Sequence, residues 1–329
     1  MANAEKKILM HVEDLKQHFP VKKWFFEKPA SVKAVDGVSF DLYEGETLGV
    51  AGESGCGKST LIRSCLRIIE PTAGTIQYEG EDITHLKGSQ MRKLRTQMQI
   101  VFQDPYSSLD SRWKVGNIIK EPMVISVVGG TTEERMDRVR LLMQQVGLDP
   151  SYTERYPHEF SGGQRQRIVI ARALATNPKL LMCDEAVSAL DVSVRAQILN
   201  LLDDLQKELN LTYLFVSHDL SVLEHICDRI MIMYLGKVVE IGSKEEIFNA
   251  PKHPYTKALL SAIPTVGEND IKRERILLQG DIPSPVNPPN GCRFHTRCPH
   301  VTERCTKEIP GMQDFGNGHL CACHFCREL

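Results

Sequence analysis

Residues 52 to 60 of the chain read GESGCGKST, which fits the pattern G-x-x-x-x-G-K-[ST]. The apolar run ETLGVA before this stretch has the composition of a strand. The apolar residues of LIRSCLRIIE after it recur at helical spacing. Glycines allow such a loop to curl until its backbone N–H groups point at phosphate oxygens, and the dipole of the following helix adds positive charge. The stretch therefore predicts a phosphate-binding loop between a strand and a helix.

The side chains of this loop have different expected tasks. Lys58 is expected to reach the β and γ phosphates of a nucleotide, and Ser59 is expected to hold Mg²⁺. Cys56 lies inside the loop and is interpreted as a small spacer.

Polar side chains follow three further apolar runs. The run LLMC ends at Asp184 and Glu185, TYLFV is followed by Ser217 and His218, and QIVF is followed by Gln103. Ligands of parallel sheets lie at the carboxyl ends of the strands. We therefore expect Asp184 to support the Mg²⁺ shell and Glu185 to polarise a water molecule. A lone histidine or glutamine at a strand end is usually structural, but here each has functional neighbours.

A second anion site is predicted by HEFSGGQRQRIVIARAL, residues 158–174. Ser161, Gly162 and Gly163 precede a run with apolar residues at helical spacing, so a hydroxyl and two flexible glycines stand at a positive helix end. About a hundred residues separate this site from the first. This separation suggests two chains assembled head to tail, each completing the nucleotide site of the other.

Three other stretches have patterns typical of local structure. Residues 9–50 are predicted to form short alternating strands. RIMIMYLGKVVEIG, residues 229–242, is predicted to form a hairpin that turns at Leu235 and Gly236. TTEERMDRVRLLMQQVG, residues 131–147, is predicted to form an amphipathic helix that serves packing.

These motifs, in this order, resemble those of the ATP-binding subunits of ABC transporters. GESGCGKST resembles the Walker A loop, Gln103 the Q-loop, FSGGQ the signature motif, LLMCDE the Walker B strand, SALD the D-loop and His218 the H-loop. The resemblance spans about residues 8 to 250. It implies an α/β P-loop ABC ATPase with a RecA-like core, an antiparallel β subdomain and a helical subdomain at about 104–175. The implied domains are an ATP-binding domain at 1–250 and a C-terminal extension at 251–329.

The resemblance also implies the roles of individual residues. Glu185 would be the general base, His218 would orient the attacking water and contact the γ-phosphate, and Gln103 would sense that phosphate and couple to a partner. Mg²⁺ would be held by Ser59, Gln103 and Asp184. The implied contacts of the loop to ATP are those of Gly52, Ser54, Gly55, Cys56, Gly57, Lys58, Ser59 and Thr60. The implied contacts to ATP on the opposite subunit are those of Ser161, Gly162, Gly163, Gln164 and Asp191.

Two positions depart from the family pattern. Phe160 stands where the family usually has leucine, and Ala186 replaces a common proline. Neither exchange removes a functional group, so an active ATPase is expected. Phe19 is nearest the place of the aromatic residue that stacks on adenine. The aromatic residues of KKWFFEK, residues 22–28, compete for that assignment, and packing is an equal alternative for all of them.

The residues beyond 250 indicate a subfamily. HPYTKALLSAIP, residues 253–264, and LQGDIPSPVNPPNGCRFHTRCP, residues 278–299, resemble the C-terminal extension of oligopeptide and dipeptide importer ATPases. The resemblance implies a pair of similar ATPase subunits beneath two membrane permeases, fed by an extracytoplasmic peptide-binding protein. The helical region at about 104–174 would meet the permease. Homodimer or heterodimer, peptide length, and even nickel as the substrate stay open.

Composition agrees with a peripheral protein at the cytoplasmic face of the membrane. The net charge is −2, which gives no reason to expect nucleic acid as a partner. No stretch approaches the roughly 20 apolar residues of a membrane span. The sequence gives less support to two other function classes. A DNA-repair or translation ATPase would carry coiled-coil inserts or a second ABC domain, and a metal-dependent regulator would not need intact nucleotide motifs.

Six of the ten cysteines lie between residues 292 and 326, which we call the cysteine tail. In a reducing compartment such a cluster favours metal over disulfides. Spacing alone leaves zinc and an iron–sulfur cluster open, since only Cys323 and Cys326 form a C-x-x-C pair. The resemblance implies a four-iron cluster on Cys292, Cys298, Cys305 and Cys323. Cys321 and Cys326 are alternatives for the fourth ligand, and the cluster's role is either structural or redox sensing.

Overall fold

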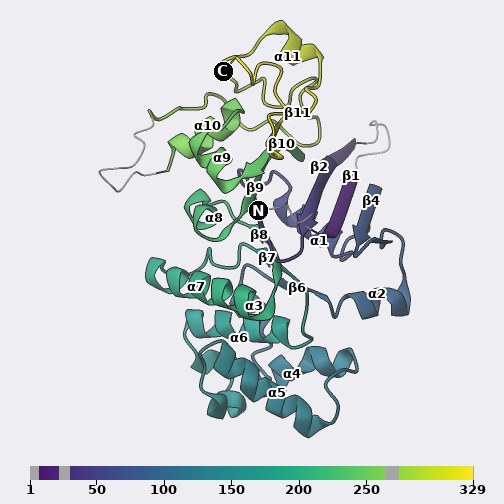
Figure 1. The fold of residues 1–329 in the computed structure, drawn as a ribbon, viewed down its shortest axis with the longest axis vertical. Helices are drawn as coiled ribbons and strands as arrows, with labels where there is room; N and C mark the ends of the chain where they lie inside the picture. The colour runs from purple at the N-terminus through teal and green to yellow at the C-terminus, as the bar shows by residue number, and fades with distance from the viewer. Residues whose placement is uncertain (1–6, 22–29, 264–273, 329) are drawn as a thin grey trace, which may run out of the picture. The chain divides into compact units, whose positions relative to one another are not determined.

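A computed structural model describes residues 7–21, 30–263 and 274–328. The chain divides into two compact units (Figure 1). Among the described residues, unit 1 contains Lys7, Tyr43–Glu46 and His85–Val216. Unit 2 contains the described residues of the ranges 8–42, 47–84 and 217–329. The boundary predicted at residue 250 stays a prediction.

Unit 1 is built around three parallel strands. These are β6 (Met98–Val101), β7 (Leu180–Asp184) and β8 (Thr212–Val216), with β7 in the middle. Every residue of β7 and β8 is buried, as expected for parallel strands covered on both faces. The sequence prediction of strands at these places is confirmed.

Helices make up the rest of unit 1, and α4, α5 and α6 lie together at one end of it in Figure 1. The stretch TTEERMDRVRLLMQQVG was predicted as an amphipathic packing helix, and α5 confirms it with Val139 and Leu142 fully buried. The helices are α2 (Gly88–Leu94), α3 (Pro105–Ser108), α4 (Val115–Ile125), α5 (Thr132–Gln145), α6 (Gly162–Leu174) and α7 (Val192–Leu209), with short 3-10 turns η1 (Pro150–Glu154) and η2 (Pro157–Glu159).

Unit 2 contains an antiparallel sheet in the order β2-β1-β4-β5. Its strands are β1 (Ile8–Val21), β2 (Ala30–Tyr43), β4 (Ala73–Tyr78) and β5 (Glu81–Asp82). The prediction of several short strands before residue 50 was wrong in length, because β1 and β2 each run for 14 residues. The pairing of β1 with β4 shifts register after Glu13, and Asp14 has a φ of 44°. This bulge bends β1 without ending it.

A second set of strands in unit 2 positions the phosphate loop. Strand β3 (Thr47–Ala51) runs parallel to β9 (Arg229–Tyr234), and β9 forms a hairpin with β10 (Lys237–Ser243). The predicted turn at Leu235 and Gly236 is confirmed, with φ values of 44° and 77°. The helices of unit 2 are α1 (Lys58–Cys65), α8 (Leu220–Ile226), α9 (Lys244–Asn249), α10 (Pro254–Ser261) and α11 (Glu303–Lys307).

Helix α1 ends earlier than its apolar spacing predicts. The apolar pattern continues to Ile69, but the helix ends at Cys65 and Arg67 has a φ of 54°. The left-handed backbone of Arg67 stops the helical hydrogen-bond pattern. Its Nε donates to the carbonyl of Ile83, which anchors the buried side chain beside the antiparallel sheet.

The cysteine tail extends the sheet that contains β10. Strand β12 (Leu320–Cys321) pairs with β10 and with β11 (Gln313–Asp314). Buried Glu240 of β10 accepts hydrogen bonds from the backbone N–H groups of Lys252 and His253, at 2.7 and 3.0 Å. Its carboxylate also lies 2.8 Å from Nε2 of His319. One carboxylate therefore ties the strand, the start of α10 and the cysteine tail together.

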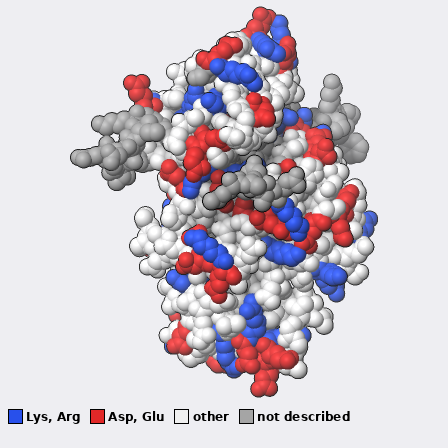
Figure 2. Space-filling view, in the orientation of Figure 1, with Lys and Arg blue, Asp and Glu red and all other residues white. Residues whose placement is uncertain are grey.

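The surface of the visible face carries both signs of charge. Lys and Arg side chains are interspersed with Asp and Glu side chains in Figure 2. Among the described residues, no helix is both long and apolar enough to cross a membrane.

Candidate functional site

The predicted phosphate loop lies between β3 and α1, and its glycines are required by close backbone contacts. A Cβ atom on Gly57 would lie 2.0 Å from the carbonyl oxygen of Ala34, and one on Gly52 would lie 2.3 Å from that of Met233. Both glycines have positive φ. The N–H of Gly236 donates to the carbonyl of Cys56 at 2.8 Å, so the β9–β10 turn braces the loop. The loop conformation is therefore set by neighbouring backbone.

Lys58 is only 5% exposed, and its ammonium group is turned into the loop. Nζ donates to the carbonyls of Gly52 and Glu53 at 2.7 and 3.1 Å. Cys56 is also buried, and burial raises the pKa of its thiol. The neutral thiol of Cys56 and the ammonium of Lys58 both lie on the inside of the loop. A curled loop of this kind can receive phosphate oxygens.

Glu53 is held by two residues that sequence reasoning did not assign. Its backbone N–H donates to the hydroxyl of Tyr255 at 2.9 Å. Its carboxylate accepts two hydrogen bonds from the guanidinium of Arg297, at 2.7 and 3.1 Å. Both partners lie in stretches whose resemblance to known proteins was noted, but no local pattern marks their contact with the loop.

His218 lies in unit 2 with the phosphate loop. The N–H of Ser217 donates to the carbonyl of Val50 at 3.2 Å, which places the start of this segment beside the end of β3. Ser217 Oγ accepts from the N–H of Asp219, and Asp219 caps α8. His218 itself is exposed.

Unit 1 brings together the polar residues that follow β6 and β7. Asp184 is the last residue of β7 and is 3% exposed. Glu185 follows with a φ of 51°, and its N–H donates to the carbonyl of Val216 at 3.1 Å. Gln103 Nε2 donates to Glu185 Oε2 at 3.0 Å. The left-handed backbone at Glu185 ends the extended conformation of β7. The carboxylate of Glu185 then accepts the hydrogen bond from the Gln103 amide.

The signature stretch forms the start of α6. Ser161 Oγ accepts from the N–H of Gln164 at 3.3 Å, and Gln164 Oε1 accepts from the N–H of Ser161 at 3.0 Å. This reciprocal capping box fixes the first turn, while Ser161 stays exposed. A Cβ on Gly163 would lie 2.5 Å from Val194 Cγ1, so glycine is needed there for α6 to approach α7. Asp191 is exposed at the start of α7.

The two departures from the family pattern are both accommodated in the core. Phe160 is 4% exposed and packs edge-on against Tyr152, with ring centroids 5.9 Å apart. Ala186 is 2% exposed. Phe19 is half-buried on β1, whereas Trp24, Phe25 and Phe26 lie outside the described residues.

The cysteine tail gathers four thiols around one small pocket. Cys292, Cys298, Cys305 and Cys323 line it, together with His253, Phe294 and Phe325. Burial raises the pKa of Cys292 and of Cys323 to about 11, and the neighbouring thiols add to both shifts. Cys321 and Cys326 are buried against Phe315 and Phe325 and do not line the pocket. Within the described ranges, no three His, Cys, Asp or Glu side chains converge as ligands of a single metal ion.

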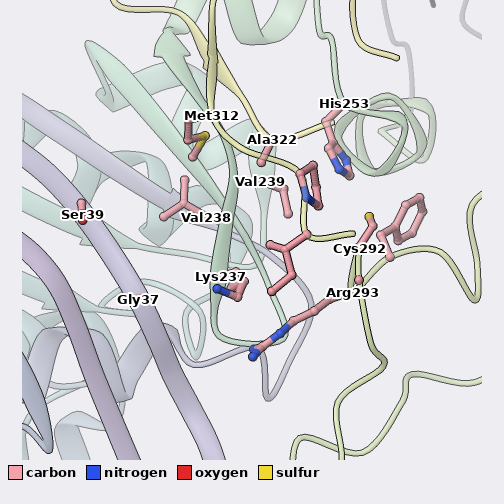
Figure 3. Close-up of a pocket in the computed structure, with 14 residues that line it drawn as sticks. Gly37, Ser39, Lys237, Val238, Val239, His253, Cys292, Arg293, Met312 and Ala322 are labelled. Atoms are coloured by element: carbon pink, nitrogen blue, oxygen red, sulfur yellow. The ribbon is translucent and has the colours of Figure 1, made fainter. Parts of the chain in front are cut away.

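A neighbouring cavity of about 180 Å³ is lined by residues of β2, β10 and the cysteine tail (Figure 3). Cys292 and Arg293 both line it, and the figure shows their side chains pointing in different directions. Arg293 donates to the carboxylate of Asp36 and to the carbonyl of Leu235. The tail is thus anchored to β2 and to the β9–β10 turn by a buried arginine.

The comparisons with known proteins agree along almost the whole chain. The ABC transporter family model matches residues 35–188, and the model of the oligopeptide/dipeptide transporter C-terminal region matches residues 239–305. The oligopeptide transport ATP-binding protein AppF of Bacillus subtilis is 52% identical over 98% of this chain and 99% of its own length. The dipeptide transport ATP-binding protein DppF of Escherichia coli is 54% identical over 96% of this chain and 93% of its own.

Among solved structures, the fold is similar to that of the ATP-binding cassette MJ0796, in a dimeric post-hydrolysis state bound to ADP and Pi. The TM-score is 0.62 at 27% identity, over 71% of this chain and 98% of that one. The nucleotide motifs lie within the match to the ABC transporter family or within the near full-length relatives, and the first part of the cysteine tail, residues 292–305, lies within the match to the C-terminal region. The chain therefore belongs to the ABC transporter family, in the group of ATP-binding proteins that carry the oligopeptide/dipeptide transporter C-terminal region.

Proposed function

We propose that this protein is the ATP-hydrolysing subunit of a dipeptide or oligopeptide importer. The observation that carries the proposal is the match, at about half identity and nearly full length, to relatives named as oligopeptide and dipeptide transport ATP-binding proteins. Neither alternative function class has comparable support, because the matches extend through the C-terminal region that is particular to peptide transporters.

The loop is proposed to bind the phosphates of ATP. Neighbouring backbone leaves no space for a side chain at Gly52 or Gly57 and so fixes the curl of the loop, and the ammonium of Lys58 lies within that loop. Mg²⁺ would be held by Ser59, Asp184 and Gln103, since hydroxyl, carboxylate and amide oxygens are the ligands it prefers. When bound, the ion offsets the charge that develops on the transferred phosphoryl group. The other proposed loop contacts to ATP remain those given above.

Glu185 is proposed as the general base for the attacking water. The contact with Gln103 supports this, because an amide that donates to a carboxylate holds it in one orientation. His218 is proposed to orient the same water and to contact the γ-phosphate. Positioning and neutralisation of charge then supply most of the acceleration of phosphoryl transfer.

The exposed start of α6 is proposed to contact ATP on a second subunit. The helix has 13 residues, its capping box fixes the first turn, and Ser161 is exposed at its N-terminus, where the helix dipole favours an anion. Similarity to the dimeric MJ0796 cassette supports the head-to-tail arrangement. The residues involved would be Ser161, Gly162, Gly163, Gln164 and Asp191. Purification of the intact transporter would show whether the second ATPase subunit is identical to this chain or merely similar to it.

A groove in unit 1 supports the proposed contact with the membrane permeases. It is lined by residues that precede and form α4, and by Tyr156. Trp113 and Ile125 are exposed on it by 45% and 58%, beside Lys114 and Lys120. Large apolar side chains exposed among cations are typical of a surface that receives another protein. The groove lies within the helical region at 104–174, and we place the permease there, at the cytoplasmic face of the membrane.

The cysteine tail is proposed to hold a four-iron cluster. The four thiols that line one pocket are those implied by the sequence resemblance. In a tetrahedral zinc site, with Zn–S bonds of about 2.3 Å, the sulfurs lie about 4 Å apart. A cluster binds each thiolate at a different iron and so needs wider spacing. Among the described residues the four thiols line one pocket, and no three ligands converge on a single metal ion, so the choice of a cluster over zinc rests on the sequence resemblance.

The fourth ligand is proposed to be Cys323. Cys326 donates its S–H to the carbonyl of Cys323 at 3.1 Å, and Cys321 is fully buried on β12, so neither thiol lines the pocket. We propose a structural role for the cluster, because a segment this small buries little core of its own. Cys292→Ser would then impair ATPase and transport equally with and without reductant. An effect that appears in one redox condition alone would favour sensing.

Transport is the direct test of the function. The protein would be co-purified with the two proposed permease subunits and placed in vesicles with a peptide-binding protein. Uptake of labelled di- and oligopeptides should require ATP and fail with a non-hydrolysable analogue. Uptake that is independent of ATP hydrolysis, or restricted to Ni²⁺, would contradict peptide import as the function.

A further inference from the structure

An arginine of the cysteine tail forms an ion pair with the phosphate loop. Arg297 Nη1 lies 2.7 Å from Glu53 Oε2, and Nη2 lies 3.1 Å from Glu53 Oε1. Two parallel hydrogen bonds between a guanidinium and a carboxylate fix both distance and orientation. The side chain of Arg297 is 8% exposed and that of Glu53 is 24% exposed, so solvent screens this pair less than a surface pair.

Glu53 is held at its backbone as well as at its side chain. Its N–H donates to the hydroxyl of Tyr255 on α10, and its carbonyl accepts from Nζ of Lys58 at 3.1 Å. The same ammonium group donates to Gly52. A displacement of Glu53 would therefore move a hydrogen-bond partner of the lysine that is proposed to contact ATP.

The two anchors of Glu53 are themselves fixed by packing. The ring of Tyr255 is fully buried and packs edge-on against Tyr234, with ring centroids 4.8 Å apart. Phe294 of the cysteine tail packs against both rings, at 5.4 and 5.3 Å. The hydroxyl that holds the Glu53 backbone therefore belongs to a ring that is fixed in a packed aromatic cluster.

The charge of Glu53 makes the pairing consequential for nucleotide binding. A carboxylate within a loop that receives phosphates opposes their negative charge unless a cation neutralises it. Arg297 supplies that cation from 244 residues further along the chain. The pair therefore has two effects, which are to orient the loop and to cancel a charge that would repel ATP.

We infer that Arg297 is a positioning residue for ATP, which sets the conformation and charge of the phosphate loop through Glu53. The inference rests on the proposed contacts between this loop and ATP. Because Arg297 directly precedes Cys298, which lines the thiol pocket, the folded state of the cysteine tail sets nucleotide affinity through this pair.

The test compares ATP affinity among full-length variants, purified anaerobically so that the tail keeps any cluster. Binding of a fluorescent ATP analogue with Mg²⁺ would be measured alongside ATPase kcat and KM. Arg297→Met should weaken binding about tenfold, as expected from the loss of a charged hydrogen-bond pair. It should raise KM while leaving kcat at saturating ATP within about twofold.

Two matched variants separate this effect from general damage to the tail. Arg304→Met removes an arginine that also directly precedes a cysteine of the pocket, but its partner Glu308 is exposed and remote in sequence from the loop, so ATP affinity should be unchanged. Adding Glu53→Gln to Arg297→Met removes the uncompensated charge and should recover most of the lost affinity. The part of the loss that is not recovered reports the orientation of the loop. A loss of affinity in Arg304→Met as large as that in Arg297→Met would show that Arg297 acts through general folding of the tail, and would overturn the inference.

Two further variants keep the test decisive. If Arg297→Met does not fold, Arg297→Lys keeps the charge but loses the paired geometry, and it should weaken binding about threefold. Affinity equal to that of the unmodified protein in every folded Arg297 variant would overturn the inference. Lys58→Ala should abolish binding. If it does not, the loop is not the ATP site and the proposed function itself fails.

Discussion

The side-chain amide of Gln103 donates a hydrogen bond of 3.0 Å to the carboxylate of Glu185, within unit 1. The two residues follow neighbouring parallel strands, β6 and β7, at the same sheet edge. In this arrangement Gln103 is engaged with the proposed base. A change in the Gln103 loop, such as the proposed contact with Mg²⁺ and the permease would bring, therefore alters the surroundings of Glu185 directly.

The two signature glycines should differ in their tolerance of a methyl group. A Cβ on Gly163 would lie 2.5 Å from Val194, whereas a Cβ on Gly162 would meet its nearest atom at 3.7 Å. Gly163→Ala should lower the free energy of unfolding by about 1–3 kcal/mol, as overpacking does. Gly162→Ala should change it by less than about 0.5 kcal/mol. Denaturant unfolding of both variants measures this difference, and equal losses would contradict the α6–α7 packing.

His253 should make stability depend on pH. Burial lowers the pKa of its imidazole from 6.5 to about 4, although the carboxylate of Glu240 opposes this shift. A group whose pKa is depressed on folding stabilises the folded state above its unfolded pKa, and this contribution is lost as the pH falls through the folded pKa. The contribution, on the order of 3 kcal/mol, should therefore be lost between about pH 6.5 and pH 4.

Asparagine is the matched substitution at this position. His253 caps α10 by accepting from the N–H of Tyr255 at 3.1 Å, and the side-chain oxygen of asparagine can accept the same bond. His253→Asn should flatten the stability profile between pH 6.5 and pH 4 while leaving other titrations in place. Identical slopes in the two proteins would show that His253 is not the group responsible.

Two cysteines of one C-x-x-C pair should differ as ligands. Cys323 lines the thiol pocket, while the S–H of Cys326 is directed to the carbonyl of Cys323. After anaerobic reconstitution, Cys323→Ser should lose most of the bound iron and its visible absorbance, whereas Cys326→Ser should retain both. Loss of iron in Cys326→Ser alone would exchange the two assignments, and zinc in place of iron in the unmodified protein would exclude the cluster.

Local sequence patterns predicted the parts of the fold that depend on neighbouring residues. The glycine loop, the buried strands β3, β7 and β8, and the hairpin turn at Leu235 are all found where their patterns indicate. The early end of α1 was missed, because apolar spacing does not report the left-handed backbone at Arg67. The length of β1 was missed because the local sequence does not show that the strand continues through the register shift after Glu13.

Contacts between distant segments could not be predicted. The pairing of Arg297 with Glu53 joins residues 244 positions apart, and that of Gln103 with Glu185 joins residues 82 apart. Each of these side chains is ordinary in its own surroundings. Their significance depends on the fold, which brings a charged tail residue to the loop and an amide to the proposed base.

Hydrolysis of ATP by Glu185→Gln, compared with the unmodified protein, tests the central claim most directly. Glutamine has nearly the same shape as glutamate but cannot accept the proton of the attacking water, so ATP binding should be retained while turnover falls by a factor of about 10²–10⁴. Binding of a fluorescent ATP analogue and release of phosphate would be followed in the same preparations. Turnover close to that of the unmodified protein, with ATP bound normally, would contradict the assignment of Glu185 as the catalytic base of a transport ATPase.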